Sequence, residues 1–327
     1  MSRLLDTVLL TALPASGKSE VRRYLALQDA ATVAGQFHMG PTVQLDDYPY
    51  VHMMRRISQE MVAMGLPPAF FPSNDQPFKE PRDWGTLIEL VNEDYRDLHA
   101  RPKLTPASAA TWLFDRYDAA RAKVGAPPAL GNLPEAVRRK LAEALEKESR
   151  ELLDEKLAGI PAGLEGKTIV IEFARGGPQG ASMPLTPPFG YAYSFACLSD
   201  EILQRASVLY IWVTPEESRR KNDERAKPGP EGDASILHHG VPIAVMLGDY
   251  GTDDMGWLVE QSDRPGTVRV AARGKVFHLP VARFDNRRDL TTFIREDPAT
   301  WPAPAVKAVH EELRRALTQL AGTEHSD

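Results

Sequence analysis

Residues 11–19 constrain this chain more than any other segment. They read Thr-Ala-Leu-Pro-Ala-Ser-Gly-Lys-Ser, and they stand between an apolar stretch, residues 4–10, and a helix-like segment, residues 20–28. A strand, a tight turn containing Gly-Lys-Ser and a helix are the local context of a phosphate-binding loop. In such a turn successive backbone N–H groups point inward, and the helix N-terminus adds a partial positive charge. The segment therefore predicts a βα unit that binds nucleotide phosphates.

Side chains of this loop are expected to have different roles. Lys18 is expected to reach the β- and γ-phosphates, and the Ser19 hydroxyl is expected to hold Mg²⁺. The first position of the motif is Ala12, where the full pattern has glycine. The residues that we expect to contact the nucleotide here are Pro14, Ala15, Ser16, Gly17, Lys18, Ser19 and Glu20.

The composition narrows the class of protein. With 327 residues the chain can form one elaborated domain or two. Cys197 is the only cysteine, which excludes an internal disulfide and a cysteine-based metal cluster. No apolar run is long enough to span a bilayer, and Asp6 interrupts the apolar start, so we expect a cytoplasmic protein that does not bind membranes. The net charge of −6 argues against broad nucleic-acid binding, although a local basic groove stays open.

Five short apolar runs rich in Val and Ile predict buried parallel strands. Each run is followed by turn residues or a polar tip, and most then lead into helical sequence. This alternation predicts an α/β fold, with a parallel sheet and helices on both faces. The predicted strands are residues 4–10, 42–45, 168–173, 207–213 and 279–284.

A long insertion separates the second and third strands, because a simple crossover needs far fewer residues. Its first part, residues 65–81, is rich in Pro and Phe and predicts an irregular loop, either lining a pocket or lying on the surface. Three helices follow, at residues 83–99, 105–123 and 134–158. We divide the chain into a core of residues 1–62 and 163–327 and a helical insertion of residues 63–162. The insertion is interpreted as a cap beside a substrate cleft, with a stabilising appendage as the alternative.

Two further elements precede the C-terminus. Residues 267–279 alternate in polarity around Arg273-Gly274-Lys275, which predicts a β-hairpin before the last strand. Residues 305–320 carry apolar side chains at helical spacing, which predicts a helix that covers the sheet.

Two carboxylates, Asp46 and Asp47, end the second predicted strand. In a parallel sheet with the phosphate loop on the first strand, this tip faces the γ-phosphate. A carboxylate there can accept a proton from a substrate hydroxyl. Strand alternation sends the two side chains opposite ways, so we expect only one, Asp46, to face the ligand. Capping of the following helix is the alternative role.

The third predicted strand also ends in charged residues. Glu172 lies among apolar neighbours and needs a partner when buried. A water-mediated contact to Mg²⁺ would supply one, and an ion pair with a nearby Arg or Lys is the alternative. Arg175, followed by two glycines, is expected to grip an anionic or polyhydroxy substrate.

A charged segment after the fourth predicted strand predicts a lid over the nucleotide. Pro215 opens a helix, and Arg219, Arg220 and Arg225 could neutralise the transferred group and exclude water. The lid is expected to span residues 215–235, with a hinge at residues 227–232. A solvated charged helix is the alternative. His238 and His239 are adjacent and would point apart, so they predict no metal site.

Residues near two other strand ends could contact ligands. Tyr48, Tyr50, His52 and Arg55 follow Asp47 and could reach an acceptor substrate. Asn286, between Asp285 and Arg287, is expected to lie beside the adenine.

Residues 13–19, then Asp46-Asp47-Tyr48, then the arginine-bearing lid, resemble the P-loop kinases that are related to polynucleotide 5′-hydroxyl kinases and small-molecule kinases. The resemblance implies a three-layer α/β/α fold whose five parallel strands lie in the order 2-3-1-4-5. It also implies that Asp46, which matches the first Asp of the family's Asp-Asp-Tyr, is the general base. Arg219, Arg220 and Arg225 correspond loosely to the arginines of the family's lid. The chain departs from the pattern at Ala12 and Ala15, where glycine is usual, and at Glu20, where Thr is usual. The helical insertion lies outside the resemblance.

Together these features predict an ATP- and Mg²⁺-dependent kinase that transfers the γ-phosphate to a hydroxyl. Three acceptors stay open, namely a small metabolite or nucleoside, a polynucleotide 5′ end and a nucleoside monophosphate. A nucleotide-dependent switch or ATPase whose insertion binds a partner protein is the alternative function. The expected catalytic residues are Lys18, Asp46, Arg175 and Arg220. The remaining expected contacts are Asp46, Asp47, Tyr48, Arg55 and Arg175 for the acceptor, Arg219, Arg225 and Asn286 for the nucleotide, and Ser19 and Glu172 for the metal.

Overall fold

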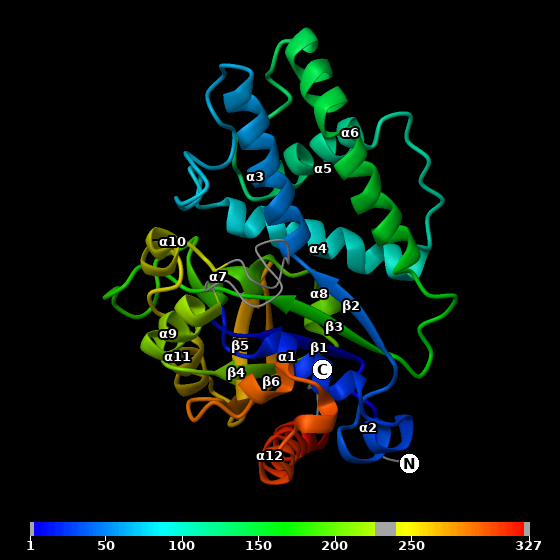
Figure 1. Cartoon of the computed structure of the whole chain (residues 1–327), viewed down its shortest axis with the longest axis vertical. Coiled ribbons are helices and arrows are strands. Elements are labelled where there is room, and N and C mark those ends of the chain that lie inside the picture. Colours follow the sequence, from blue (N-terminus) through cyan, green and yellow to red (C-terminus); the bar gives the residue numbers. More distant parts are fainter. Residues whose placement is uncertain (1–2, 226–239, 324–327) are drawn as a thin grey trace.

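The computed structural model of the protein describes residues 3–225 and 240–323. At its centre is a six-stranded mixed sheet in the order β2-β3-β1-β4-β6-β5 (Figure 1). Neighbouring strands are parallel except for β5 and β6, which are antiparallel. The strands are β1 (Thr7–Thr11), β2 (Thr42–Asp46), β3 (Thr168–Phe173), β4 (Ala206–Trp212), β5 (Thr267–Ala272) and β6 (Lys275–Asp285).

The prediction of five parallel strands in the order 2-3-1-4-5 is wrong in strand count and in order. A hairpin was expected to precede the last strand, but its second arm continues into that strand without a break, so both form β6. The first arm is β5, which adds an antiparallel strand at the edge of the sheet. Arg273 and Gly274 join the two arms with φ angles of 49° and 74°, the left-handed pair that a two-residue hairpin turn requires.

Helices cover both faces of the sheet, as the alternation of elements predicted. On one face, Val21 and Tyr24 of α1 and Leu313 of α12 pack against Leu10 of β1. On the other face, helices α4, α7 and α11 pack against β1, β3, β4 and β5. The bounds of these helices are Lys18–Ala26 for α1, Ala303–Gly322 for α12, Asp83–Ala100 for α4, Gly190–Cys197 for α7 and Met255–Glu260 for α11.

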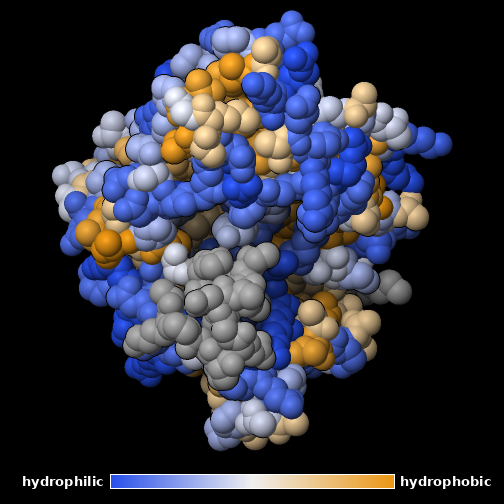
Figure 2. Space-filling view, turned by 45° about the horizontal axis from the view of Figure 1, so that its top comes forward, coloured by the Kyte–Doolittle hydropathy of each residue, from blue (hydrophilic) through white to orange (hydrophobic). Residues whose placement is uncertain are grey.

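Four helices, which we call the helical region, gather at one end of the molecule (Figure 1). They are α3 (Tyr48–Ala63), α4, α5 (Ala109–Lys123) and α6 (Glu135–Ala158). Helix α4 links this region to the sheet, because Val91 packs on the sheet side while Leu87 packs among the other helices. Helix α3, which we had placed in the core, also packs here through Met54 and Ile57. The surface is hollowed where the helical region meets the α/β region (Figure 2).

Helix α5 starts four residues later than predicted. Thr105 was expected near its start, but the helix begins at Ala109 because Ser108 caps it, accepting a hydrogen bond from the Thr111 amide at 3.1 Å. Glu146 of α6 then accepts from the amides of Ala109 and Ala110 at 2.9 and 3.1 Å. A carboxylate from a neighbouring helix thus binds the first amides of α5, which its own sequence does not reveal.

The remaining elements are short. They are α2 (Ala30–Gln36), α8 (Asp200–Leu203), α9 (Pro215–Arg225), α10 (Ile243–Gly248) and the 3-10 helices η2 (Thr292–Arg295) and η3 (Pro298–Thr300). Residues 65–81 form neither helix nor strand, but Phe70, Phe71 and Phe78 within them are buried. No helix in the described part of the chain combines the length and the apolar character that crossing a membrane requires.

Candidate active site

Side-chain hydrogen bonds hold four carbonyl groups of the turn between β1 and α1. Because the C=O and N–H of a trans peptide point in opposite directions, the amides of Ala15 and Gly17 point away from Ser218 and Asn286, which bond the Pro14 and Ser16 carbonyls. Successive inward amides form an anion-binding concavity. The bonds are Tyr191 Oη to the Ala12 carbonyl (2.9 Å), Ser16 Oγ to the Leu13 carbonyl (2.6 Å), Ser218 Oγ to the Pro14 carbonyl (2.7 Å) and Asn286 Nδ2 to the Ser16 carbonyl (2.7 Å).

Two residues of this turn have left-handed backbone conformations. Gly17 has a φ angle of 103°, and a Cβ there would lie 2.5 Å from Thr291 Oγ1 and 2.7 Å from Asn286 Nδ2. Glycine is therefore required at this position both by conformation and by space. Ala15 has a φ angle of 55°, which costs about 1–2 kcal/mol for a residue with a Cβ.

Asn286 supports the turn from behind. It is fully buried, and Nδ2 donates to the Ser16 carbonyl and to Thr291 Oγ1 at 2.8 Å, while Oδ1 accepts from the Leu290 amide at 2.7 Å. The side chain that was expected beside the adenine is thus used inside the protein. Its neighbour Arg287 lies with its guanidinium 3.8 Å from the Trp212 ring centre, at the end of β4.

Helix α1 begins directly after the turn with Lys18, Ser19 and Glu20 in its first turn. The first amides of a helix have no partner within it, so these residues add N–H groups and the positive end of the helix dipole. Ser19 is exposed and Lys18 is half-buried. The Glu20 carboxylate is turned to Arg295, whose Nε lies at 2.5 Å. Lys18 and Ser19 therefore carry the functional groups of this helix start.

Two carboxylates lie side by side at the ends of β2 and β3. Asp46 is in register with Glu172, and both interact with Arg22 of α1, at 3.9 and 2.7 Å respectively. The Asp46 side chain is 32% exposed and accepts a hydrogen bond from the Tyr48 amide at 2.8 Å. Burial and the neighbouring carboxylates of Glu172 and Asp47 raise the pKa of Asp46 to about 7, whereas Arg22 lowers it.

Asp47 is buried and has different partners. Its Oδ2 lies 2.7 Å from Nη1 of Arg175. Burial raises the pKa of Asp47, while the positive charges of Arg175 and Lys18 lower it. Lys18 is thus close enough to act on Asp47, the residue directly after β2, so this carboxylate and the lysine of the phosphate loop lie at the same edge of the sheet.

Arg175 has a more enclosed place than the sequence indicated. It is 2% exposed, and its guanidinium donates to Ser194 Oγ at 2.9 Å and to the Trp84 carbonyl at 3.2 Å, besides the ion pair with Asp47. It also lies over the Trp84 ring, 4.8 Å from its centre. A guanidinium with these partners holds Asp47 in position, and it has little surface left for gripping a substrate.

Helix α9 carries the arginines of the predicted lid. Its N-terminal part contacts the phosphate loop through Ser218, whereas Arg220 forms ion pairs with Glu217 and Glu224 of the same helix, both at 2.5 Å. Arg219 is paired with Glu216 at 3.2 Å, and Arg225 ends the helix. Residues 226–235 of the lid, its hinge at residues 227–232, and His238 and His239 lie outside the described residues.

The donor set fits a cation that is held mainly by phosphate oxygens and water. Within residues 3–225 and 240–323, no group of three or more His, Cys, Asp or Glu side chains could hold a metal. Glu172, expected near Mg²⁺, is ion-paired with Arg22 instead. Ser19 offers one hydroxyl oxygen, and Mg²⁺ commonly takes only one or two protein ligands beside a nucleotide.

Of the four residues after Asp47 that were expected near an acceptor, two are directed to the helical region and two are not. Tyr50 is buried and its hydroxyl donates to Asp94 at 2.6 Å, while His52 lies 4.0 Å from Glu148 of α6, so both are directed into or along the helical region. Tyr48 is exposed. Arg55 lies with its guanidinium 3.9 Å from the Phe71 ring centre and is influenced electrostatically by Tyr48.

Sequence reasoning missed three side chains that shape this site. Tyr191 and Ser218 hold the phosphate loop, and Asp249 lies close to Arg175 and Arg55. Tyr191 and Ser218 give no signal in one sequence, because a single hydroxyl that binds a distant carbonyl follows no motif. Asp249 lies in the run Gly-Asp-Tyr-Gly, where turn residues around an acid could have indicated it.

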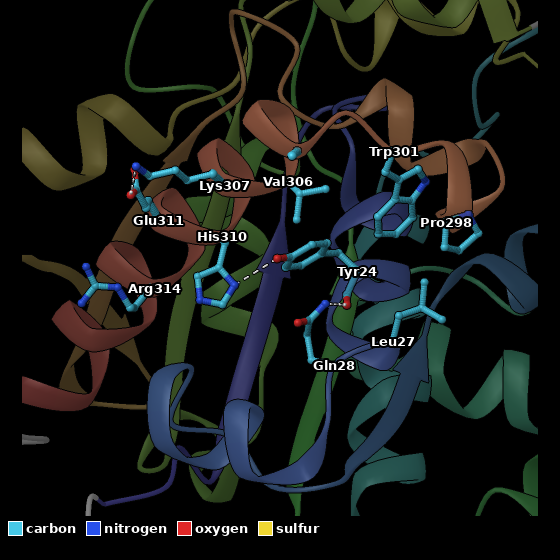
Figure 3. A pocket seen from close by; sticks show the side chains of 11 residues that line it. Tyr24, Leu27, Gln28, Pro298, Trp301, Val306, Lys307, His310, Glu311 and Arg314 are labelled. Carbon is cyan, nitrogen blue, oxygen red and sulfur yellow. Dashed lines mark hydrogen bonds and ion pairs between the residues drawn. The ribbon is translucent and has the colours of Figure 1, made fainter.

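Two further hollows lie on the part of the surface that the structure describes. One, of about 950 Å³, includes Trp212, Pro215 and Asp285 at the ends of β4 and β6. The other, of about 750 Å³, lies between α1 and α12, with Trp301 at one end and Arg314 at the other (Figure 3). There the hydroxyl of Tyr24 pairs with Nδ1 of His310 at 3.0 Å, so its central polar groups are already bonded to one another.

Comparisons of the chain with models of known protein families, with curated proteins and with solved structures found no match.

Proposed function

We propose that the protein is a phosphotransferase that moves the γ-phosphate of ATP to a hydroxyl group with the help of Mg²⁺. One observation carries the proposal, namely that Ser218 and Asn286 bond the Pro14 and Ser16 carbonyls of the loop after β1, while Lys18 of the same loop lies close enough to Asp47 to lower the pKa of that carboxyl. Phosphoryl transfer needs this combination of an anion cradle, a cation and a group that receives the acceptor's proton.

In the proposed reaction, the turn amides and Lys18 bind the β- and γ-phosphates, and the Ser19 hydroxyl is the protein ligand of the metal. When bound, Mg²⁺ supplies positive charge to the phosphate oxygens. We place the nucleobase at the hollow beside Trp212, since it adjoins the start of α9 and the end of β6. The guanidinium groups of Arg283 and Arg287 already lie over the Trp212 ring, 4.0 and 3.8 Å from its centre, so we expect a base to stack on these guanidinium planes.

Asp46 is the residue that we assign to proton transfer. A new bond forms between the acceptor oxygen and the γ-phosphorus, the bond from that phosphorus to the β–γ bridging oxygen breaks, and ADP leaves. The proton of the acceptor hydroxyl passes to the Asp46 carboxylate. A base is most effective when its pKa lies near the working pH, and the pKa of Asp46 is raised to about 7. Asp47 is held by Arg175 and lies close enough to Lys18 for that lysine to lower its pKa.

The test combines binding and transfer. Titration calorimetry with Mg-ATP should show binding to the wild-type protein, and phosphorus NMR with pooled hydroxyl acceptors should show ADP and a new phosphomonoester. Lys18→Ala should reduce transfer at least 100-fold, because the transferred phosphate loses its main cation. Lys140→Ala, at an exposed position on α6, is the matched control and should retain activity.

Three results would contradict this proposal. They are the absence of Mg-ATP binding, unchanged transfer by Lys18→Ala, and release of inorganic phosphate with no acceptor product. The last result would instead favour the nucleotide-dependent switch or ATPase.

A further inference from the structure

A buried carboxylate near the end of β3 has no role in the proposed transfer. Asp249, directly after α10, is 5% exposed, and its Oδ2 has no hydrogen-bond partner among the residues that the structure describes. Burying a carboxylate oxygen without a donor is unfavourable, and buried polar atoms nearly always have a partner. The oxygen therefore requires a donor that this part of the chain does not supply.

Residues 249–252 are held close to the groups that face the phosphates. Gly177 and Thr252 form an antiparallel bridge with backbone hydrogen bonds of 2.9 and 3.2 Å. A Cβ at Gly176 would lie 2.5 Å from the Thr252 carbonyl and 2.8 Å from that of Asp249, so glycine permits this close contact. Because Gly176 follows Arg175, which is paired with Asp47, the position of Asp249 is fixed relative to the end of β2.

Two side chains from the helical region approach Asp249. Trp84 of α4 and Arg55 of α3 both lie close enough to the Asp249 carboxyl to lower its pKa. Burial nevertheless raises the pKa of Asp249 to about 7, because it outweighs the lowering by these neighbours. Arg55 donates to the Asn74 carbonyl at 2.7 Å, but it forms no ion pair with Asp249 among the described residues. A guanidinium and a carboxylate are thus near one another without direct contact.

We infer that the acceptor binds between Arg55 and Asp249, and that it is an uncharged polyhydroxylated compound such as a sugar, a polyol or a nucleoside. This inference rests on the proposed kinase function and names the acceptor class of the same site. A carboxylate oxygen accepts a hydrogen bond from one hydroxyl, and a guanidinium donates to a second. A pair of neighbouring hydroxyls satisfies both groups at once.

Charge argues against an acceptor that already carries phosphate. Near these strand ends, Arg175 is paired with Asp47 and Arg22 with Glu172, while Lys18 belongs to the nucleotide site. Arg55 lies under the influence of both Asp249 and Asp75. A phosphate placed here would meet the Asp249 carboxylate, and like charges at such a place repel. The same argument disfavours the phosphate-rich 5′ end of a polynucleotide.

Matched pairs of probes test the inference. Glucose and uridine are compared with glucose 6-phosphate, uridine 5′-monophosphate and a 5′-hydroxyl oligonucleotide, each with Mg-ATP and the full-length protein. Saturation-transfer NMR measures acceptor binding, and phosphorus NMR measures transfer. We expect binding of, and transfer to, at least one neutral probe, with at least tenfold weaker binding of its phosphorylated counterpart.

The variant Asp249→Asn keeps the shape of the side chain and removes its charge. We expect its KM for the neutral acceptor to rise at least tenfold, while calorimetry shows its affinity for Mg-ATP to be within twofold of wild type. Arg55→Gln, a second variant outside the buried segment, should raise the same KM, and Asp154→Asn on the exposed side of α6 is the matched control. Circular dichroism checks that each variant is folded.

Failure of the inference and failure of the kinase proposal give different results. If Mg-ATP binds but the protein binds no neutral probe, prefers a phosphorylated probe or oligonucleotide, or keeps its KM in both Asp249→Asn and Arg55→Gln, the acceptor inference is wrong. If the wild-type protein does not bind Mg-ATP, the kinase proposal itself is wrong.

Discussion

The phosphate loop and the region around Asp249 differ in how completely their polar groups are bonded. In the loop, four carbonyls are bonded by side chains, one by Ser16 of the loop itself and three by Tyr191, Ser218 and Asn286 from elsewhere in the fold. Around Asp249, by contrast, a carboxylate oxygen is buried without a partner and the pKa of Arg55 is lowered by burial. The fold therefore preorganises the phosphate loop, whereas the hydrogen bonding around Asp249 is incomplete in the free protein.

This difference indicates how the two proposed substrates are recognised. A loop that is already bonded in its binding conformation needs no rearrangement to accept phosphates, so little binding energy is lost in ordering it. An incomplete region gains hydrogen bonds only when a ligand with the right donors arrives, which gives selectivity at the expense of stability in the free protein. Three substitutions can break or sharpen this comparison.

Asp46→Asn should have the largest effect, because it removes the group proposed to accept the proton in the transfer. We expect kcat to fall about 100-fold, equivalent to about 2.7 kcal/mol, with Mg-ATP affinity nearly unchanged. In the wild type, kcat/KM should rise with pH as Asp46 loses its proton near pH 7. Steady-state kinetics between pH 5 and 9 measures both effects. A variant that keeps the wild-type rise in rate with pH would show that Asp46 is not the base.

Asn286→Ala should test whether the loop depends on its support from behind. The substitution leaves the Ser16 carbonyl and the Leu290 amide without their side-chain partner. We expect a loss of about 2–3 kcal/mol in the free energy of unfolding and about tenfold weaker binding of Mg-ATP. Urea denaturation and calorimetry measure the two quantities. Unchanged nucleotide affinity in a destabilised variant would mean that the loop keeps its shape without Asn286.

The regions also differ in how well the sequence predicted them. The phosphate loop follows a local pattern, so the strand, turn and helix around Gly17 and Lys18 could be placed from residues alone. The sheet was predicted as α/β with helices on both faces and a hairpin at residues 267–279. The sequence did not show that the hairpin joins the last strand, because these residues alternate in the same way whether they form a separate hairpin or extend that strand.

The region around Asp249 could not be predicted because it is assembled from distant segments. Arg55, Trp84 and Asp249 come from three elements, and only the packing of α4 between the sheet and the helical region brings them together. Similarly, the sequence could not show that Arg175 is enclosed, since its partners Ser194 and Trp84 are brought to it by tertiary contacts. The sequence could therefore show that charged residues lie at the strand ends. It could not show which residue pairs with each of them, because the pairing depends on tertiary packing.

Asp249→Asn should have the smallest effect of the three. Unlike the other two substitutions it should be favourable, because it should increase the free energy of unfolding. The folded protein raises the pKa of Asp249 from its ordinary 3.8 to about 7, so the native state binds this proton more tightly than the unfolded chain does. The contribution of this group to stability therefore falls as pH rises from about 4 to about 7 and stays low above that. An asparagine avoids the loss, so without ligands the variant should be more stable than wild type by about 1–3 kcal/mol at pH 8 and equally stable at pH 4. Urea denaturation at both pH values measures this difference. Equal stability at pH 8 would show that the Asp249 carboxylate is already satisfied in the free protein, and the contrast between a completed loop and an incomplete acceptor region would then not hold.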